Sequence, residues 1–267
     1  MSIRVRHETT YHYEHAVRRS VQTLRISPPN TARQKVLHWK LDLPAPARAW
    51  TDGFGNLSHT LVLDQPHDSI LICAQGVVEV QDGDLSEPAG PMPLEVFQRP
   101  TALTLMDAAI EAFANPLAHT IRTRPFMGLH DLMLALIDRM PYASGHTRVG
   151  DTAAQAFATG HGVCQDHTHV FLACARSLGL AARYVSGYIL SNDQGHVASH
   201  AWAEVWIGER WVGFDVSNSR SAGAEHIRLA QGMDYADTCP VRGVRTGGGT
   251  ESMRSFAQVE SQLSSQQ

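Results

Sequence analysis

The sequence predicts an α+β protein in which a strand-rich first part precedes a second part of mixed helices and strands. Short segments of partly alternating apolar and polar residues, separated by Pro, Gly and Asn, fill residues 1 to about 80. A segment rich in Pro and Gly follows at 82–93. Beyond it, apolar residues recur at helical spacing before strand-like segments return. The length of 267 residues suits one large domain or two small ones.

The first part is expected to form an antiparallel β-sandwich. Turn-forming clusters at 28–30 and 52–56 separate its strands, as is typical of short antiparallel strands at close spacing. The candidate strands are residues 3–11, 21–27, 35–43, 57–63 and 69–80.

The second part is expected to follow the linker, which gives a β-rich domain at residues 1–98 and a second domain at 99–267. Pro141 ends one helical segment, and Gly179 suits the position just after another. The candidate helices are 103–113, 129–140 and 164–178; the candidate strands are 183–190, 200–207, 211–215 and 252–260, with a loop at 243–249.

Composition excludes several classes of function. Lys and Arg number 22 against 26 Asp and Glu, so the net charge of −4 predicts no nucleic-acid surface. No apolar run approaches the roughly 18 residues of a membrane span, and the first 15 residues lack the apolar core of a secretion signal. The four widely spaced cysteines, Cys73, Cys164, Cys174 and Cys239, are typical of free thiols in a reducing compartment. We therefore expect a cytoplasmic protein without membrane partners.

Cys164 is the candidate nucleophile. It follows Gly160 and Gly162, which permit a tight loop, and it lies at or near the start of a predicted helix. Unpaired N–H groups and the positive end of the helix dipole favour a thiolate at such a position. The alternative for any one cysteine is a small buried apolar side chain, which is our interpretation of the other three.

His200 and Asp215 are the candidate partners of Cys164. Alternation along 200–206 places His200, Trp202 and Glu204 on one face of a strand and small apolar residues on the other. A turn at 208–209 that pairs Trp206 with Trp211 makes Asp215 the diagonal neighbour of His200 on the same face. The sequence therefore predicts a Cys-His-Asp triad of Cys164, His200 and Asp215.

Histidine is frequent, at 15 residues, so a metal site is the alternative interpretation. His167 and His169 are two residues apart on a helix and point to different sides. The other candidate ligands are His161 and perhaps His196 or His200, and the predicted helix lacks the i, i+4 pair of a helical zinc site. We expect neither a metal nor another cofactor.

At these residues the sequence resembles the bacterial transglutaminase-like superfamily, in particular its cysteine peptidases with a β-rich N-terminal domain. The matching blocks, in the family's order and spacing, are residues 162–166 (GVCQD), 178–188 (LGLAARYVSGY), 199–205 (SHAWAEV), 211–215 (WVGFD) and 230–237 (AQGMDYAD). The chain departs from the family pattern in three places: Val216-Ser217 replaces Pro-Thr, His167 an aromatic residue and Met233 an arginine.

The resemblance implies a papain-like core, with the cysteine on a helix packed against an antiparallel sheet, preceded by a β-sandwich-like domain. Carried over by position, Cys164 is the nucleophile, His200 the general base and acid, and Asp215 the residue that orients it. The implied activity is that of a bacterial hydrolase, a peptidase or amidase, which attacks a peptide or protein amide and forms a thioester.

Two other functions stay open in the sequence. One is a true acyltransferase that passes the acyl group to an amine instead of water; Tyr188, Trp202 and Trp206 could line the required dry channel or simply fill the core. The other is a non-catalytic binding module. The second oxyanion donor (Tyr142 or a Trp indole), the substrate and the role of the first domain, which could present substrate, mediate a homo-oligomer or brace the core, are not fixed by the residues.

Overall fold

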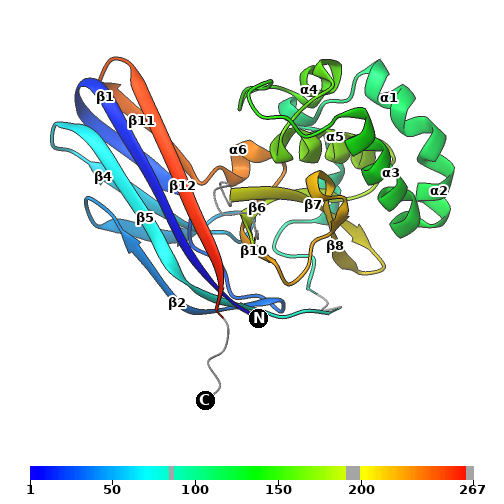
Figure 1. The fold of residues 1–267 in the computed structure, drawn as a ribbon, viewed down its shortest axis with the longest axis horizontal. Coiled ribbons are helices and arrows are strands. Elements are labelled where there is room, and N and C mark those ends of the chain that lie inside the picture. Colours follow the sequence, from blue (N-terminus) through cyan, green and yellow to red (C-terminus); the bar gives the residue numbers. More distant parts are fainter. Residues whose placement is uncertain (84–86, 191–198, 263–267) are drawn as a thin grey trace.

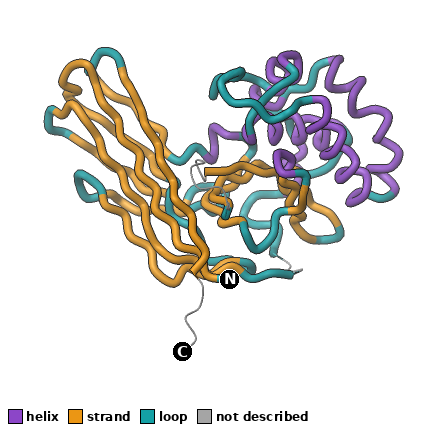
Figure 2. Tube along the Cα trace, in the orientation of Figure 1, coloured by secondary structure: helices purple, strands orange, loops and turns teal. Residues whose placement is uncertain are grey.

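The structure, a computed structural model, describes residues 1–83, 87–190 and 199–262 and has two parts (Figure 1). One part is a sheet of long strands, and the other is a smaller sheet with helices packed around it (Figure 2). This combination of antiparallel sheets and helices confirms the predicted α+β class. Within the described ranges, no helix is both long enough and apolar enough to cross a membrane.

The first sheet has seven strands among the described residues, and the 23-residue strand β1 (Ser2–Leu24) runs through it. The first half of β1 pairs with β5 and β12, and the second half pairs with β4 and β11. Trp39 of β2 and Ala47 of β3, from opposite ends of the strand order, pack on the same core around Leu61, so the sheet folds over on itself. The other strands are β2 (Gln34–Asp42), β3 (Ala47–Thr51), β4 (Leu57–Leu63), β5 (His67–Val80), β11 (Val241–Gly247) and β12 (Glu251–Gln262).

The C-terminal strands differ most from expectation. The loop expected at 243–249 is wrong for residues 243–247, which lie in β11 and pair with the second half of β1, but residues 248 and 249 do lie outside the strands. Gly247, Gly248 and Gly249, with φ values of 87°, 96° and 65°, form only the turn into β12, where positive φ favours glycine. The strand expected at 252–260 is confirmed as β12. Both strands join the first sheet. The expected second domain, residues 99–267, therefore includes residues 241–262, which lie in the sheet of the first part.

The second part is a five-stranded antiparallel sheet, in the order β10-β6-β7-β8-β9, with helices packed on it. Helix α5 contacts β6 and β7, and the apolar face of β7 (Ala201, Ala203 and Val205) joins the core that α5 forms, as the alternation predicts. The helices are α1 (Ala108–Ala114), α2 (Ala118–Thr123), α3 (Pro125–Arg139), α4 (Ala153–Thr159), α5 (Cys164–Ser177) and α6 (Tyr235–Thr238); the strands are β6 (Ala182–Ile189), β7 (Ser199–Ile207), β8 (Arg210–Asp215), β9 (Arg220–Ser221) and β10 (His226–Gly232).

A buried interface joins the two parts. Ile3 and Val5 of β1 pack with Ile227 of β10 in one apolar cluster. The Gln34 side chain donates to the carbonyl of Arg228 and accepts its N–H, both at 2.9 Å, as a neighbouring strand would. The first sheet is therefore fixed to the β10 edge of the second by apolar packing and by hydrogen bonds.

Arg183 of β6 is fully buried beside this interface. Its Nε donates to Glu204 at 2.7 Å, and its guanidinium lies 4.0 Å from the centre of a Trp211 ring. Burial lowers the pKa of Arg183 to about 10, and the charge of Glu204 opposes that shift. Arg228 adds a second cation 3.8 Å from the same carboxylate. Glu204 therefore compensates buried positive charge on the sheet that carries the site.

We expect Glu204→Gln to destabilise the fold by about 3 kcal/mol, because a buried guanidinium loses its main counter-charge. Denaturant unfolding monitored by tryptophan fluorescence measures the change. Glu209→Gln, on the exposed turn between β7 and β8, is the matched control and should change stability by less than about 0.5 kcal/mol. Equal midpoints for the two variants would contradict the role given to Glu204.

Candidate active site

Cys164 is the first residue of α5. The carboxylate of Asp166 accepts the backbone N–H of Val163 at 2.8 Å and the hydroxyl of Thr147 at 2.6 Å, which fixes the start of the helix. Gly162 leaves room for this carboxyl group, since a Cβ there would lie 2.7 Å from the Cβ of Asp166. The thiol therefore lies at the positive end of the helix dipole, where a thiolate is favoured.

His167 ties the start of α5 to its surroundings. Its Nε2–H donates to the carbonyl of Met140 at 2.8 Å, so its Nδ1 accepts the hydroxyl of Ser217 at 2.8 Å. Burial lowers the pKa of His167, which fits a neutral ring with one donor and one acceptor. At this departure from the family pattern, histidine links the helix to the turn after β8.

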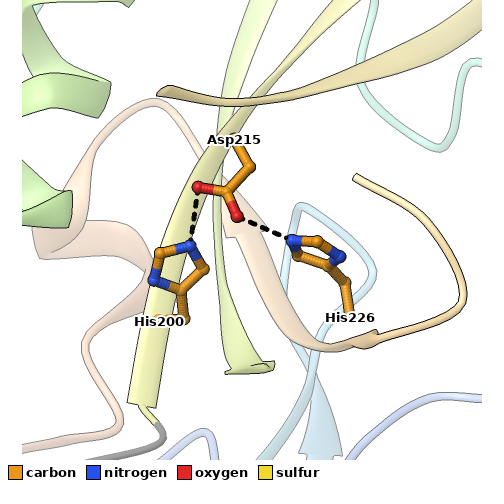
Figure 3. Close-up of side chains that lie close together, drawn as sticks. All are labelled: His200, Asp215 and His226. Atoms are coloured by element: carbon orange, nitrogen blue, oxygen red, sulfur yellow. Dashed lines mark hydrogen bonds and ion pairs between the residues drawn. The ribbon is translucent and has the colours of Figure 1, made fainter. Parts of the chain in front are cut away.

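The hairpin of β7 and β8 has the predicted register. Trp206 pairs with Trp211, and Ala203 pairs with Phe214. Asp215 then ends β8 beside His200, and its Oδ1 lies 2.8 Å from the Nε2 of His200 (Figure 3). The structure thus brings together these two of the three predicted residues through strand pairing alone.

Cys164 meets His200 at the end of this sheet. The Nε2 of His200 faces Asp215, so Nδ1 is the ring nitrogen left for the thiol, and His200 and Cys164 line the same cavity. Burial alone would lower the pKa of His200, but the hydrogen bond to Asp215 and the electrostatic interaction with Cys164 outweigh it and raise the pKa to about 10. The structure therefore brings the three predicted residues together: Asp215 is hydrogen-bonded to His200, and His200 lines the same cavity as Cys164. This arrangement favours a charged imidazole.

Asp215 has two further partners. Its side chain is fully buried, and its Oδ2 accepts Nδ2–H of Asn218 at 2.7 Å and lies 2.9 Å from Nε2 of His226. Burial would raise the pKa of Asp215, but the hydrogen bonds from His200 and His226 outweigh this effect and lower the pKa below its ordinary value. The carboxylate is thus held ionised. No sequence pattern pointed to His226, because β10 itself was not predicted.

A cavity of about 290 Å³ opens in front of Cys164 and His200. The first sheet provides one wall through β1 and β12, and the second part provides the other. The described residues that line the cavity include no Asp, Glu, Lys or Arg, and several of them have phenol or hydroxyl side chains. They include His7, Thr9, Tyr11, Tyr184, Tyr188, Tyr235, Met253 and Ser255. A substrate would therefore meet the sulfur between the two parts of the protein.

Of the three aromatic residues considered as the lining of a dry channel, Trp202 and Trp206 are not among the residues that line the cavity. The indole of Trp202 donates to Glu204 at 3.4 Å, and Trp206 packs in a separate apolar cluster. Tyr188, by contrast, lines the cavity. Tyr142 lies close enough to Cys164 for charge on the sulfur to raise its pKa, although burial is the larger cause.

The histidines proposed as metal ligands are engaged otherwise. His161 stacks on His146 with ring centres 5.2 Å apart, and His169 accepts the N–H of Tyr235 at 3.2 Å. His196 lies outside the described residues.

A different group, His200, Asp215 and His226, has three ligand-type atoms within 4.8 Å of one another. In His226, however, Nδ1 accepts the N–H of Gly223 at 3.1 Å. Its Nε2 therefore carries the proton and donates to the carboxylate, whereas a metal ligand needs a free lone pair there. This donor set fits a hydrogen-bonded carboxylate and not a metal ion.

Comparisons with known proteins agree with this fold. Residues 3–79 match the model of the bacterial transglutaminase-like N-terminal region, and residues 113–216 match that of the transglutaminase-like superfamily. An uncharacterized protein of Mycobacterium tuberculosis is 31% identical over 277 residues, covering 90% of this chain and 86% of its own. The chain belongs to the transglutaminase-like superfamily.

Two further proteins are similar to this transglutaminase-like protein. An uncharacterized protein of Mycobacterium leprae is 26% identical, covering 92% of this chain and 94% of its own. The crystal structure of a candidate cysteine protease from Cytophaga hutchinsonii matches the fold with a TM-score of 0.73 and 18% identity, covering 100% of this chain and 92% of that one. Family and fold together support an enzyme that acts through a cysteine.

We expect Asp215→Asn to lower the pKa of His200 by about two units, because a buried negative charge 2.8 Å from the ring nitrogen is removed. The titration of the His200 ring protons by NMR measures this shift. Asp138→Asn, on the exposed side of α3, is the control and should leave the titration unchanged. An unaltered His200 midpoint in a folded Asp215→Asn protein would refute the electrostatic coupling.

Proposed function

We propose that the protein is a cysteine amide hydrolase, a peptidase or amidase, with Cys164 as nucleophile, His200 as general acid and base, and Asp215 as the orienting residue. One observation carries the proposal. A buried carboxylate holds one nitrogen of His200, while the other nitrogen is left for a thiol at a helix start that opens into a cavity. A thiolate beside an imidazolium is the activated nucleophile of this chemistry.

In the first half of the reaction, the Cys164 sulfur adds to the carbonyl carbon of the amide, and the carbonyl oxygen takes the negative charge. The backbone N–H of Cys164, unpaired at the helix start, is the first donor to that oxygen. When the intermediate collapses, the C–N bond breaks, His200 gives its proton to the leaving amine, and a thioester remains.

In the second half, water attacks the thioester while His200 takes its proton. The C–S bond then breaks, which releases a carboxylic acid and restores the thiol. Tyr142, whose phenol interacts electrostatically with Cys164, is our candidate for the second oxyanion donor.

The aromatic lining favours one alternative. Tyr11, Tyr184, Tyr188 and Tyr235 line the cavity beside the sulfur, and such a wall could exclude water in favour of an amine acceptor. The protein would then be an acyltransferase that uses the same nucleophile and thioester. We also propose that the protein works in the cytoplasm, because all four cysteines are free thiols.

We expect iodoacetamide to label Cys164 at least about tenfold faster than the other cysteines at pH 7, because only this thiol pairs with an imidazolium. Burial raises the pKa of Cys174 to about 12 and also raises that of Cys73, which makes both slow. Mass spectrometry of tryptic peptides after timed labelling gives the four rates. Equal rates in the native protein would support a non-catalytic binding module instead.

We expect Cys164→Ala to abolish turnover of peptide amides while the fold is kept, because the thiol at the start of α5, beside His200, is the proposed nucleophile. Cys73→Ala, in the first sheet, is the control and should retain activity. Products from a peptide-amide library, with and without a dansylated alkylamine, separate the two reactions. New carboxylic acids without amine incorporation support hydrolysis; incorporation of the fluorescent amine would overturn it in favour of the acyltransferase.

A further inference from the structure

His226 approaches the candidate triad from the side opposite His200. It begins β10, and its side chain is almost completely buried. Its ring points at the Asp215 carboxylate, with Nε2 2.9 Å from Oδ2, while His200 lies 2.8 Å from Oδ1 (Figure 3). The edge of the Trp202 ring system packs against it, with centres 5.1 Å apart. Two imidazoles thus hold one carboxylate, one at each oxygen.

The backbone fixes which nitrogen of His226 carries the proton. The N–H of Gly223 donates to Nδ1 at 3.1 Å, and the N–H of His226 donates back to the carbonyl of Gly223 at 3.0 Å. A proton on Nδ1 would face the N–H of Gly223 directly. The ring therefore has its proton on Nε2 and is oriented as a donor to Asp215.

This donor restrains the plane of the carboxylate. A carboxylate turns easily about its Cβ–Cγ bond unless both oxygens are held. Asn218 and His226 hold Oδ2, and this leaves Oδ1 aimed at Nε2 of His200. Without His226, Oδ2 would keep only Asn218 as its side-chain donor among the described residues.

We propose that His226 is a positioning residue, which fixes the Asp215 carboxylate so that it holds His200 in line with Cys164. The inference rests on the proposed function. His226 is not among the residues that line the cavity in front of the sulfur, and its hydrogen bond within the site goes to Asp215.

The titration of His200 reports this role. The titratable groups that face His200 are Cys164 from α5, Asp215 from β8 and His226 from β10, with His167 of α5 interacting weakly through charge. A carboxylate that turns away stabilises the imidazolium less, so the pKa of His200 falls from about 10 and less thiolate forms.

The test compares His226→Gln with His226→Met. The two side chains have similar length, but only the glutamine amide can donate to Oδ2. We expect the methionine variant to lower the His200 midpoint in NMR by about one pH unit and to slow iodoacetamide labelling of Cys164 at pH 7 about tenfold. We expect the glutamine variant to stay close to the wild type in both measurements.

Three outcomes would overturn the inference. The first is a folded methionine variant with the wild-type midpoint and labelling rate, whatever its melting temperature, since lost stability alone indicates a structural role. The second is a glutamine variant that behaves like the methionine variant.

The third needs no variant. Nitrogen-15 NMR of the wild-type imidazoles should show His226 protonated at Nε2, and protonation at Nδ1 would reject the proposal even if the methionine variant failed to fold. Slow labelling of wild-type Cys164 would instead refute the proposed function, while the His200 midpoints would still test His226.

Discussion

The carboxylate of Asp215 is the constraint on which the candidate site depends. A buried anion is costly unless it is hydrogen-bonded. Here the donors come from two strands of the second sheet and from the turn after β8. His200 comes from β7, Asn218 from the turn after β8, and His226 from β10. The same hydrogen bonds that make this anion tolerable also orient the imidazole, so folding and site geometry share one set of contacts.

The first sheet belongs to the site as much as the second part does. The walls of the cavity include Thr9 and Tyr11 of β1 and Met253 of β12, which line it together with Cys164. The interface that Ile3 and Ile227 share holds these walls in place. After the second part, the chain returns to the first sheet, where β11 and β12 pair with β1. The wall that the first sheet contributes therefore comes from both the beginning and the end of the chain. The first part therefore forms a wall of the candidate site as well as packing against the second part.

Local patterns in the sequence predicted the part of the site that strand alternation and one turn determine, which is the placement of Asp215 beside His200. The Trp206–Trp211 pairing followed from a two-residue turn and placed Asp215 beside His200, because register on a hairpin is fixed by its turn. The glycines before Cys164 marked a helix start for a similarly local reason. The family pattern supplied the link between that helix and the hairpin.

What the sequence did not predict depends on pairing between distant segments. β10 begins with His226 and was missed because its neighbours are β6 and the first sheet, not an adjacent hairpin. The strand at 241–247 was taken for a loop, since its glycines mark the following turn and its partner lies more than 200 residues earlier in β1. Recognising His226 requires the pairing of β10 with β6, which places it beside the end of β8.

The charges around the sulfur support an ion pair. The lining residues in the described ranges carry no carboxylate, ammonium or guanidinium group, and desolvation keeps His7 neutral by lowering its pKa to about 4. In such surroundings a thiolate and an imidazolium attract each other more strongly than they would in water. Asp215 adds its negative charge behind His200 and not behind Cys164. It therefore stabilises the imidazolium without competing for the carbonyl carbon that the sulfur must reach.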